Sequence, residues 1–281
     1  MVCAPVQVEV PAPVEVPAPV EVPAPVEVPA QVQVEVLASN LKTEQFNNTE
    51  FFFTIKSKKN AGPDYQSPLY KALEKNQDSN ITLCREKPAK ALDAKGKPKA
   101  YKSYGVLEFE ELNKIWKSNN HLYEVIRTEH KPYFDIEFRF IDQDQKKPIF
   151  DTIINLLKSS FEFIGVPFDL SKDCAICENV GVGESGLFAG LSKASYHVIL
   201  NNGFKFASHT DSNKFAKYLQ QRITLEHEFN NLIMEEGIAI DLKVYNKNRC
   251  FKLPYQSKAN STRIQIPSQR NQLSEFLISY N

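Results

Sequence analysis

The 281-residue chain lacks the features that define several common protein classes. With 10 glycines against 17 prolines and an aromatic content of 11%, it is neither collagen-like nor wholly disordered. Its five cysteines are an odd, widely scattered number, which argues against a disulfide framework. No apolar run approaches the roughly 18 to 20 residues that a membrane helix needs, and residues 1–20 do not read as a signal peptide. We therefore expect an intracellular protein with no membrane partner.

A formal net charge of zero hides an uneven distribution of charge. The first 40 residues hold five glutamates and no Lys or Arg, so residues 41–281 carry 34 basic and 29 acidic side chains. This modest positive excess is compatible with a surface that binds a polyanion such as nucleic acid, and also with an ordinary solvated surface.

A six-residue repeat, Pro-Ala-Pro-Val-Glu-Val, occupies most of residues 11–30. Proline at this density removes backbone donors and fixes φ, which favours an extended, polyproline-II-like tether over a helix or strand. From about Leu41 onward, aromatic and aliphatic residues mix with charged ones. We therefore expect a disordered tether at 1–40 and a folded domain at 41–281.

Strand and helix patterns interleave along residues 41–281, which predicts a mixed α/β (α+β) domain. The predicted strands are 122–126, 133–140, 196–200 and 238–245, and the predicted helices are 149–163 and 214–234. Leu107, Leu112, Ile115 and Trp116 are spaced as one helical face.

Two further segments have a distinctive composition. The Lys, Gly and Pro cluster at 87–99 predicts a flexible basic loop. Cys174 and Cys177 form a lone Cys-x-x-Cys with no second pair at zinc-ligand spacing, so we place them on an apolar strand and not in a zinc site.

The segment 133–140 alternates apolar residues with Asp135, Glu137 and Arg139. Carboxylates at positions i and i+2 of a strand project from one face, with Cβ atoms roughly 6 to 7 Å apart. Such a pair can bind one or two divalent metal ions, although a solvated strand face produces the same pattern. Asp241, on a predicted strand, is a candidate third carboxylate.

Basic and polar residues in two other segments are suited to binding phosphate oxygens. Strand alternation puts Lys193, Ser195 and His197 on one face, where a cation, a hydroxyl and an imidazole could contact a phosphate. Five cations follow Asp241: Lys243, Lys247, Arg249, Lys252 and Lys258. They suit a triphosphate or a nucleic-acid backbone, and a solvated loop has the same composition.

These motifs, in this order, resemble those of the archaeo-eukaryotic primase superfamily, most closely its eukaryotic primase-polymerase and large-DNA-virus primase branch. The resemblance covers roughly residues 100–260 and is carried by 121–126 (HLYEVI), 133–138 (YFDIEF), 193–197 (KASYH), 241–252 (DLKVYNKNRCFK) and 257–258 (SK). It implies a primase catalytic core in which an α/β unit packs beside an RRM-like unit, with the site between them.

The resemblance further implies a template-directed nucleotidyltransferase, a DNA primase or primase-polymerase of DNA replication. Asp135, Glu137 and Asp241 would bind two Mg²⁺ or Mn²⁺ ions. Tyr123 would lie near the nucleotide sugar, and the residues implied at its phosphates are Lys193, Ser195, His197, Arg249, Lys252 and Lys258. Lys252 stands where we expect arginine in close relatives, which keeps the charge but loses the bidentate fork. The implied partners are single-stranded DNA template, dNTP or NTP, and a replicative helicase or polymerase on another chain.

Two alternatives remain open at the level of sequence. A metal-dependent nuclease can also place two acids on a strand, although nucleases of the Asp…Glu-x-Lys type have lysine where this chain has Arg139. A non-catalytic relative of primases that binds single-stranded DNA would share the fold, but retention of all three acids argues against it.

Overall fold

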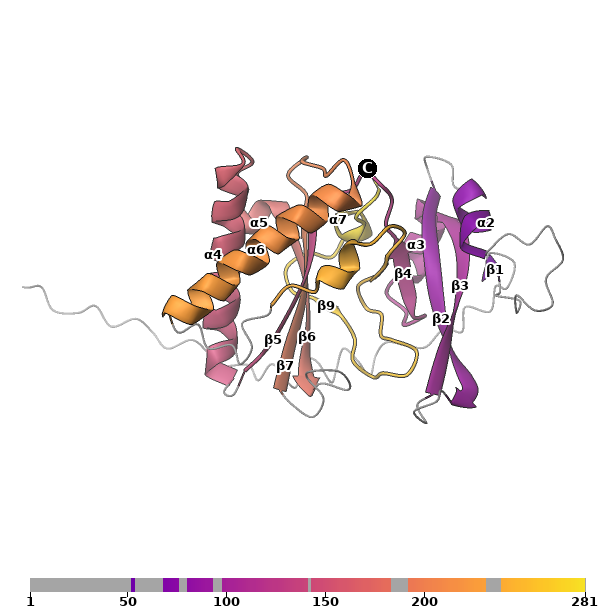
Figure 1. The fold of residues 1–281 in the computed structure, drawn as a ribbon. Helices are drawn as coiled ribbons and strands as arrows, with labels where there is room; N and C mark the ends of the chain where they lie inside the picture. The colour runs from indigo at the N-terminus through magenta and orange to yellow at the C-terminus, as the bar shows by residue number, and fades with distance from the viewer. Residues whose placement is uncertain are drawn as a thin grey trace, which may run out of the picture. The chain divides into compact units, whose positions relative to one another are not determined.

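The computed structural model describes residues 52–53, 68–75, 80–92, 98–140, 143–182, 192–230 and 239–280. All belong to the unit 41–281, so the predicted tether lies outside the described residues and the boundary at residue 40 stays a prediction. These residues form a mixed α/β fold with two antiparallel sheets, as the sequence predicts (Figure 1). None of the helices in these ranges has the length and apolar character needed to cross a membrane.

The first sheet has five strands in the order β1-β3-β2-β4-β8. They are β1 (Phe52–Phe53), β2 (Asn80–Leu92), β3 (Pro98–Glu108), β4 (Leu122–Val125) and β8 (Cys250–Lys252). Helix α2 (Pro68–Lys75) precedes β2 in the chain, and helix α3 (Phe109–Ile115) follows β3. The predicted strand at 122–126 is confirmed as β4, whereas the predicted helical face is divided, because Leu107 belongs to β3 and the helix begins only at Phe109.

The flexible loop predicted at 87–99 is wrong for most of its length. β2 and β3 form one long antiparallel hairpin in which Lys87 pairs with Tyr101 and Leu92 pairs with Pro98. The register shifts between Pro88 and Leu92, near the end of the hairpin. Main-chain pairing with the neighbouring strand thus carries a polar segment into the sheet, and side-chain composition gives no sign of it.

The second sheet has four strands in the order β5-β7-β6-β9. They are β5 (Tyr133–Arg139), β6 (Cys174–Val182), β7 (Ser192–Leu200) and β9 (Ile266–Pro267). The strands predicted at 133–140 and 196–200 are confirmed, and β7 begins earlier than predicted, at Ser192. Cys174 and Cys177 lie on β6, as the apolar-strand interpretation requires.

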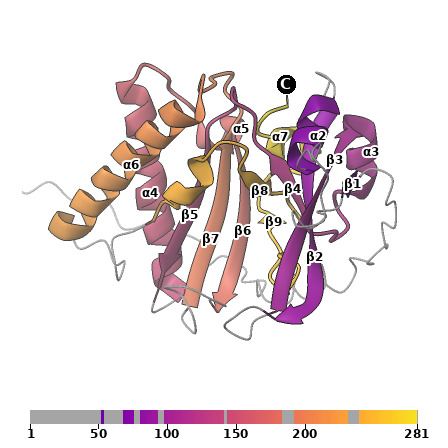
Figure 2. The same ribbon diagram turned by 45° about the vertical axis from the view of Figure 1, so that its right-hand side comes forward.

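Helices α4 (Gln143–Phe163) and α6 (His209–Asn230) cover one face of the second sheet (Figures 1 and 2). The predicted helices are confirmed in their described parts, and both begin earlier than predicted. Phe134 of β5 packs against Phe161 and Phe215, with ring centroids 6.2 and 6.1 Å apart. Because the apolar side chains of β5 face these helices, its charged side chains project from the opposite face of the sheet.

The strand predicted at 238–245 is wrong. Ile240 makes only an isolated bridge with Ile136, after which the chain enters a 3₁₀ helix, η3 (Leu242–Tyr245). The side chain of Asp241 caps this helix, since its Oδ1 accepts a hydrogen bond from the backbone N–H of Lys243 at 2.9 Å. The capping bond offers the backbone a local alternative to strand pairing.

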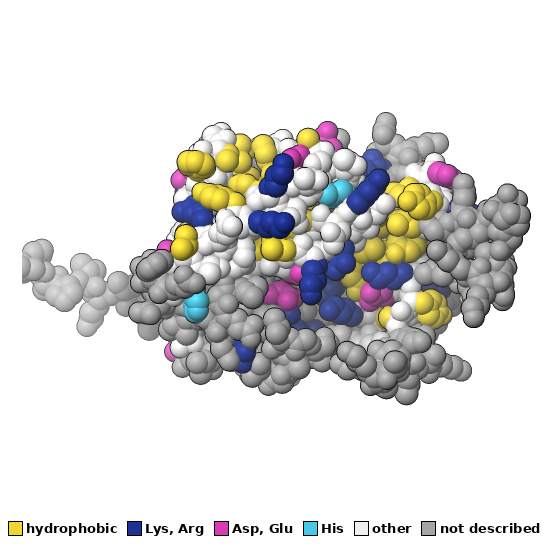
Figure 3. Space-filling view, in the orientation of Figure 1, with side chains coloured by type: hydrophobic (Ala, Val, Ile, Leu, Met, Phe, Trp, Pro, Cys, Tyr) yellow, Lys and Arg dark blue, Asp and Glu magenta, His cyan; other side chains and the backbone are white. Residues whose placement is uncertain are grey.

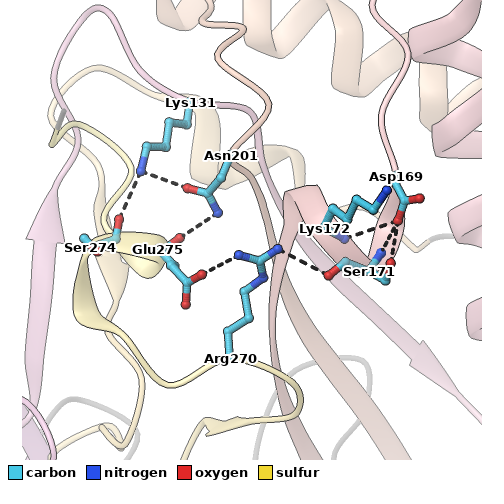
Figure 4. A network of polar contacts seen from close by, with 8 residues as sticks. All are labelled: Lys131, Asp169, Ser171, Lys172, Asn201, Arg270, Ser274 and Glu275. Atoms are coloured by element: carbon cyan, nitrogen blue, oxygen red, sulfur yellow. Dashed lines mark hydrogen bonds and ion pairs between the residues drawn. The ribbon is translucent and has the colours of Figure 1, made fainter.

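The C-terminal segment 270–280 contacts both sheets and contains the short helix α7 (Leu273–Phe276). Glu124 of β4, 2% exposed, accepts hydrogen bonds from the backbone N–H groups of Ile278 and Ser279, both at 2.7 Å. A second polar network ties the segment to the end of the other sheet and to α5 (Leu170–Asp173) (Figure 4). Its members are Lys131, Ser171, Asn201, Arg270, Ser274 and Glu275.

Two buried histidines, His209 at the start of α6 and His130 just before β5, predict a stability that depends on pH. The rings of His130 and His209 stack with centroids 5.1 Å apart, and burial lowers the pKa of both. The unfolded chain therefore binds protons at these histidines more readily than the folded protein does. Their contribution to the free energy of unfolding is full above about pH 6.5 and is lost as the pH falls below that value. Asp135 and His197 also have shifted pKa values, but both are unchanged in His209→Gln. Between pH 7.5 and 5.5 we therefore expect the free energy of unfolding of wild type, measured by urea unfolding relative to His209→Gln, to fall by on the order of 1 kcal/mol. An equal loss in wild type and variant would contradict the prediction.

Candidate active site

β5 and β7 build a polar patch on the face of the second sheet opposite α4 and α6. In their antiparallel register Asp135 stands opposite His197, and Glu137 stands opposite Ser195. Residues directly opposite each other in an antiparallel pair project from the same face. The alternation recognised in the sequence therefore gathers two carboxylates, a hydroxyl and an imidazole on one surface.

Asp241 reaches the same patch through the isolated bridge at Ile240. The backbone N–H of Asp241 donates to the carbonyl of Asp135 at 2.9 Å, and that of Glu137 donates to the carbonyl of Ala239 at 2.7 Å. These two bonds place Asp241 directly beside Asp135, and the charge of Asp241 helps to raise the pKa of Asp135. The structure thus brings all three predicted acids together, although Asp241 lies outside any strand.

Asp135 is in an environment that is unfavourable for an isolated carboxylate. Burial, followed by the charges of Glu137 and Asp241, raises the pKa of Asp135 to about 8, against the opposing charges of Lys252 and Lys193. Its Oδ1 is buried and accepts no hydrogen bond. An unsatisfied carboxylate oxygen beside two further acids costs stability unless a cation compensates it. The donor set, all carboxylate oxygen, fits Mg²⁺ or Mn²⁺.

Two of the three carboxylates, those of Glu137 and Asp241, have other partners in this conformation. Lys193 Nζ lies 2.6 Å from Glu137 Oε1, and Asp241 Oδ1 accepts from the Lys243 N–H. Accordingly, no three His, Cys, Asp or Glu side chains among the described residues are close enough to hold one metal ion as they stand. Asp135, Glu137 and Asp241 would hold a metal once the Glu137 and Asp241 side chains turn away from these partners.

Three of the predicted phosphate-binding lysines surround His197. Burial, and then the charges of Lys252, Lys258 and Lys193, hold the pKa of His197 well below its usual value, so its imidazole is neutral. His197 Nε2 lies 3.9 Å from Asp135 Oδ1, a distance that is too long for a hydrogen bond. Because the imidazole is neutral, the two side chains do not form an ion pair either. Burial and the neighbouring Lys258 lower the pKa of Lys252 to about 8.

Charged side chains of both signs are gathered on one face of the molecule. On the face shown in Figure 3, Lys and Arg side chains gather around a few Asp and Glu side chains near the middle of the view. Positive charge that is brought together in this way repels itself and favours binding of an anion.

Two residues that are predicted to contact the nucleotide, Tyr123 and Arg249, have no contact with the three acids that the structure records. Tyr123 pairs with Lys252 across β4 and β8, and its buried hydroxyl donates to Glu86 Oε2 at 2.8 Å. The charge of Arg249 acts on Tyr133, lowering the pKa of that phenol against the effect of burial. Tyr123 and Arg249 therefore border the cluster, and their assigned contacts with a nucleotide stay predictions.

Sequence reasoning missed two residues of the site, Asn179 and Arg263. Asn179 lies on β6 opposite Ser195. Arg263 Nε donates to Asn179 Oδ1 at 2.8 Å, and the charge of Arg263 helps to lower the pKa of Lys252. A polar residue two positions after Cys177 on an apolar strand is the only signal that the sequence offered, whereas Arg263 belongs to no motif.

Comparison with known proteins adds no family to this description. No protein-family model and no curated protein matches the chain. Any functional assignment therefore depends on the chemistry of the residues just described and on the order of their motifs.

Proposed function

We propose that this protein is a template-directed nucleotidyltransferase, a DNA primase or primase-polymerase, which joins a 3′-hydroxyl to the α-phosphate of a nucleotide. The observation that carries the proposal is the convergence of Asp135, Glu137 and Asp241 beside a cluster of lysines and the neutral His197. Nucleotidyl transfer requires both parts, a carboxylate site for divalent metals and a cationic site for the triphosphate.

Each group has a defined task in this proposal. The carboxylates of Asp135, Glu137 and Asp241 would hold Mg²⁺ or Mn²⁺, which would supply activation of the hydroxyl and neutralisation of developing charge on the phosphates. Lys193, whose Nζ lies 2.6 Å from Glu137 Oε1, would contact a phosphate of the nucleotide. Ser195 on the same strand offers a hydroxyl donor, and Lys252 and Lys258 supply further positive charge.

The topology of the second sheet supports the RRM-like unit that the motif resemblance implies. The chain order is β5-α4-β6-β7-α6 followed by the Ile240 bridge, and the spatial order is bridge-β5-β7-β6. Both helices cover one face (Figure 2), which gives the βαββαβ arrangement of ferredoxin-like and RRM units. In this arrangement the open face of the sheet carries the acids.

Labelled nucleotide incorporation on single-stranded DNA, unprimed and primed, tests the proposal. With Mg²⁺ or Mn²⁺ and all four dNTPs or NTPs, we expect products whose sequence follows the template and which disappear with EDTA. Glu111→Gln, which changes an exposed acid of α3 outside the proposed site, should leave synthesis unchanged. Metal-dependent degradation of the DNA without nucleotides, or no synthesis on either template, would overturn the proposal.

A further inference from the structure

A guanidinium lies over β6, on the side of the polar patch farthest from Asp241. Arg263 is held by two bonds to one residue: Nε donates to Asn179 Oδ1 at 2.8 Å, and Nη2 donates to the Asn179 carbonyl at 3.5 Å. It also passes over Gly181, where an added Cβ would come within 3.8 Å of Arg263 Nε. Asn179 and Gly181 are two positions apart on β6, so both lie on the face of the sheet that carries the polar patch.

The strand register sets the place of this guanidinium relative to the acids. Glu137 stands opposite Ser195 on β7, and Ser195 stands opposite Asn179 on β6. Adjacent strands lie about 4.8 Å apart, so Asn179 is roughly 10 Å from Glu137 across the sheet. Arg263 therefore lies at one end of a row that begins at the carboxylates and has Ser195 at its centre.

Arg263, Lys258 and Lys252 lie close enough near this row for the first two charges to act on the third. The charges of Lys258 and Arg263 lower the pKa of Lys252 and those of Asp135 and Glu137 raise it, and the effect of Asp135 lies between those of the two cations. Glu137 is engaged by Lys193. Cations held this close together on a folded surface favour a multiply charged anion spread along the row.

We propose that Arg263, positioned by Asn179, binds the terminal phosphate of a nucleoside triphosphate whose α-phosphate lies at Asp135 and Glu137. This inference rests on the proposed function and adds to it the residue that distinguishes a triphosphate from a diphosphate. The edge of the Arg263 guanidinium formed by Nε and Nη2 donates to Asn179, and the outer edge formed by the two Nη atoms can donate to phosphate oxygens in a bidentate contact. Asn179 acts through Arg263, which makes it a positioning residue.

Calorimetric titration of the full chain with dGTP and dGDP, each with Mg²⁺, tests the inference. Wild type should bind dGTP about tenfold or more tightly than dGDP, since a charge-assisted contact to the terminal phosphate is lost with the diphosphate. Arg263→Gln should bind both nucleotides about equally, and Asn179→Ala should reduce the preference several-fold. Arg263→Lys should retain part of it, because the charge remains while the fork is lost. Lys217→Gln, which removes an exposed cation of α6, should keep the wild-type preference.

The two proposals fail in different ways. If wild type binds neither nucleotide and incorporates none, the proposed function fails and this inference fails with it. If wild type incorporates nucleotides and Arg263→Gln keeps a tenfold preference for dGTP, or loses affinity for both nucleotides equally, the inference alone is wrong. Circular dichroism of each variant identifies unfolding, and Asn179→Ala, which leaves the guanidinium in place, gives a second reading should Arg263→Gln not fold.

Discussion

If the proposed function is correct, we expect Asp241→Asn to reduce nucleotide incorporation by about 10³-fold while the protein remains folded. The substitution removes a negative charge that acts on Asp135 and one of the three carboxylates available to a metal. It keeps an oxygen that can accept the hydrogen bond of the Lys243 N–H, so the cap of η3 is preserved. The expected loss is therefore catalytic and not structural, and steady-state incorporation on a primed template measures it.

Asp169→Asn provides a matched control for this prediction. Asp169 caps α5 in the same way, accepting hydrogen bonds from the backbone N–H groups of Ser171 and Lys172. It is exposed and lies apart from the three acids in the chain and in the sheet register. Incorporation at the wild-type rate by Asp241→Asn, or an equal loss in Asp169→Asn, would show that Asp241 does not serve the reaction.

We expect Glu124→Ala to lower the free energy of unfolding by about 3 to 4 kcal/mol. The substitution removes two hydrogen bonds of 2.7 Å to a buried carboxylate and leaves the N–H groups of Ile278 and Ser279 without an acceptor. Burial raises the pKa of Glu124, and the same two N–H groups oppose that rise by stabilising the charged form. Urea unfolding at pH 7 measures the change.

Two further variants separate this contact from the general effect of losing an acid. Glu124→Gln keeps one acceptor oxygen and should lose about half as much stability. Glu275→Ala breaks the pair with Arg270, whose side chains are about one-fifth exposed, and should cost about 1 kcal/mol or less. If Glu124→Ala is no more destabilising than Glu275→Ala, the C-terminal segment is not held to β4 as described.

Period-two alternation explains what the sequence could predict. It identified β5 and β7 and put Asp135, Glu137, Ser195 and His197 on the correct faces, because strand geometry alone determines which side chains share a face. It also gave the mixed α/β class, since helical and strand periods interleave along the chain.

Contacts between distant segments explain what the sequence could not predict. Asp241 joins the site through one bridge and a capped 3₁₀ helix, where strand pairing of 238–245 was expected. The hairpin of β2 and β3 depends on main-chain pairing, which residue composition at 87–99 does not reveal. Arg263 enters the site through a single side-chain partner on another strand, and no local pattern marks such a contact.

The most direct test of the central claim is the position of Mn²⁺ in crystals of the full chain grown with a non-hydrolysable nucleoside triphosphate. Anomalous scattering locates the ion without reference to activity. We predict manganese peaks between the carboxylates of Asp135, Glu137 and Asp241, with the triphosphate extending toward Arg263. Manganese bound elsewhere, with Glu137 still paired with Lys193 and Asp241 still capping η3, would contradict the account.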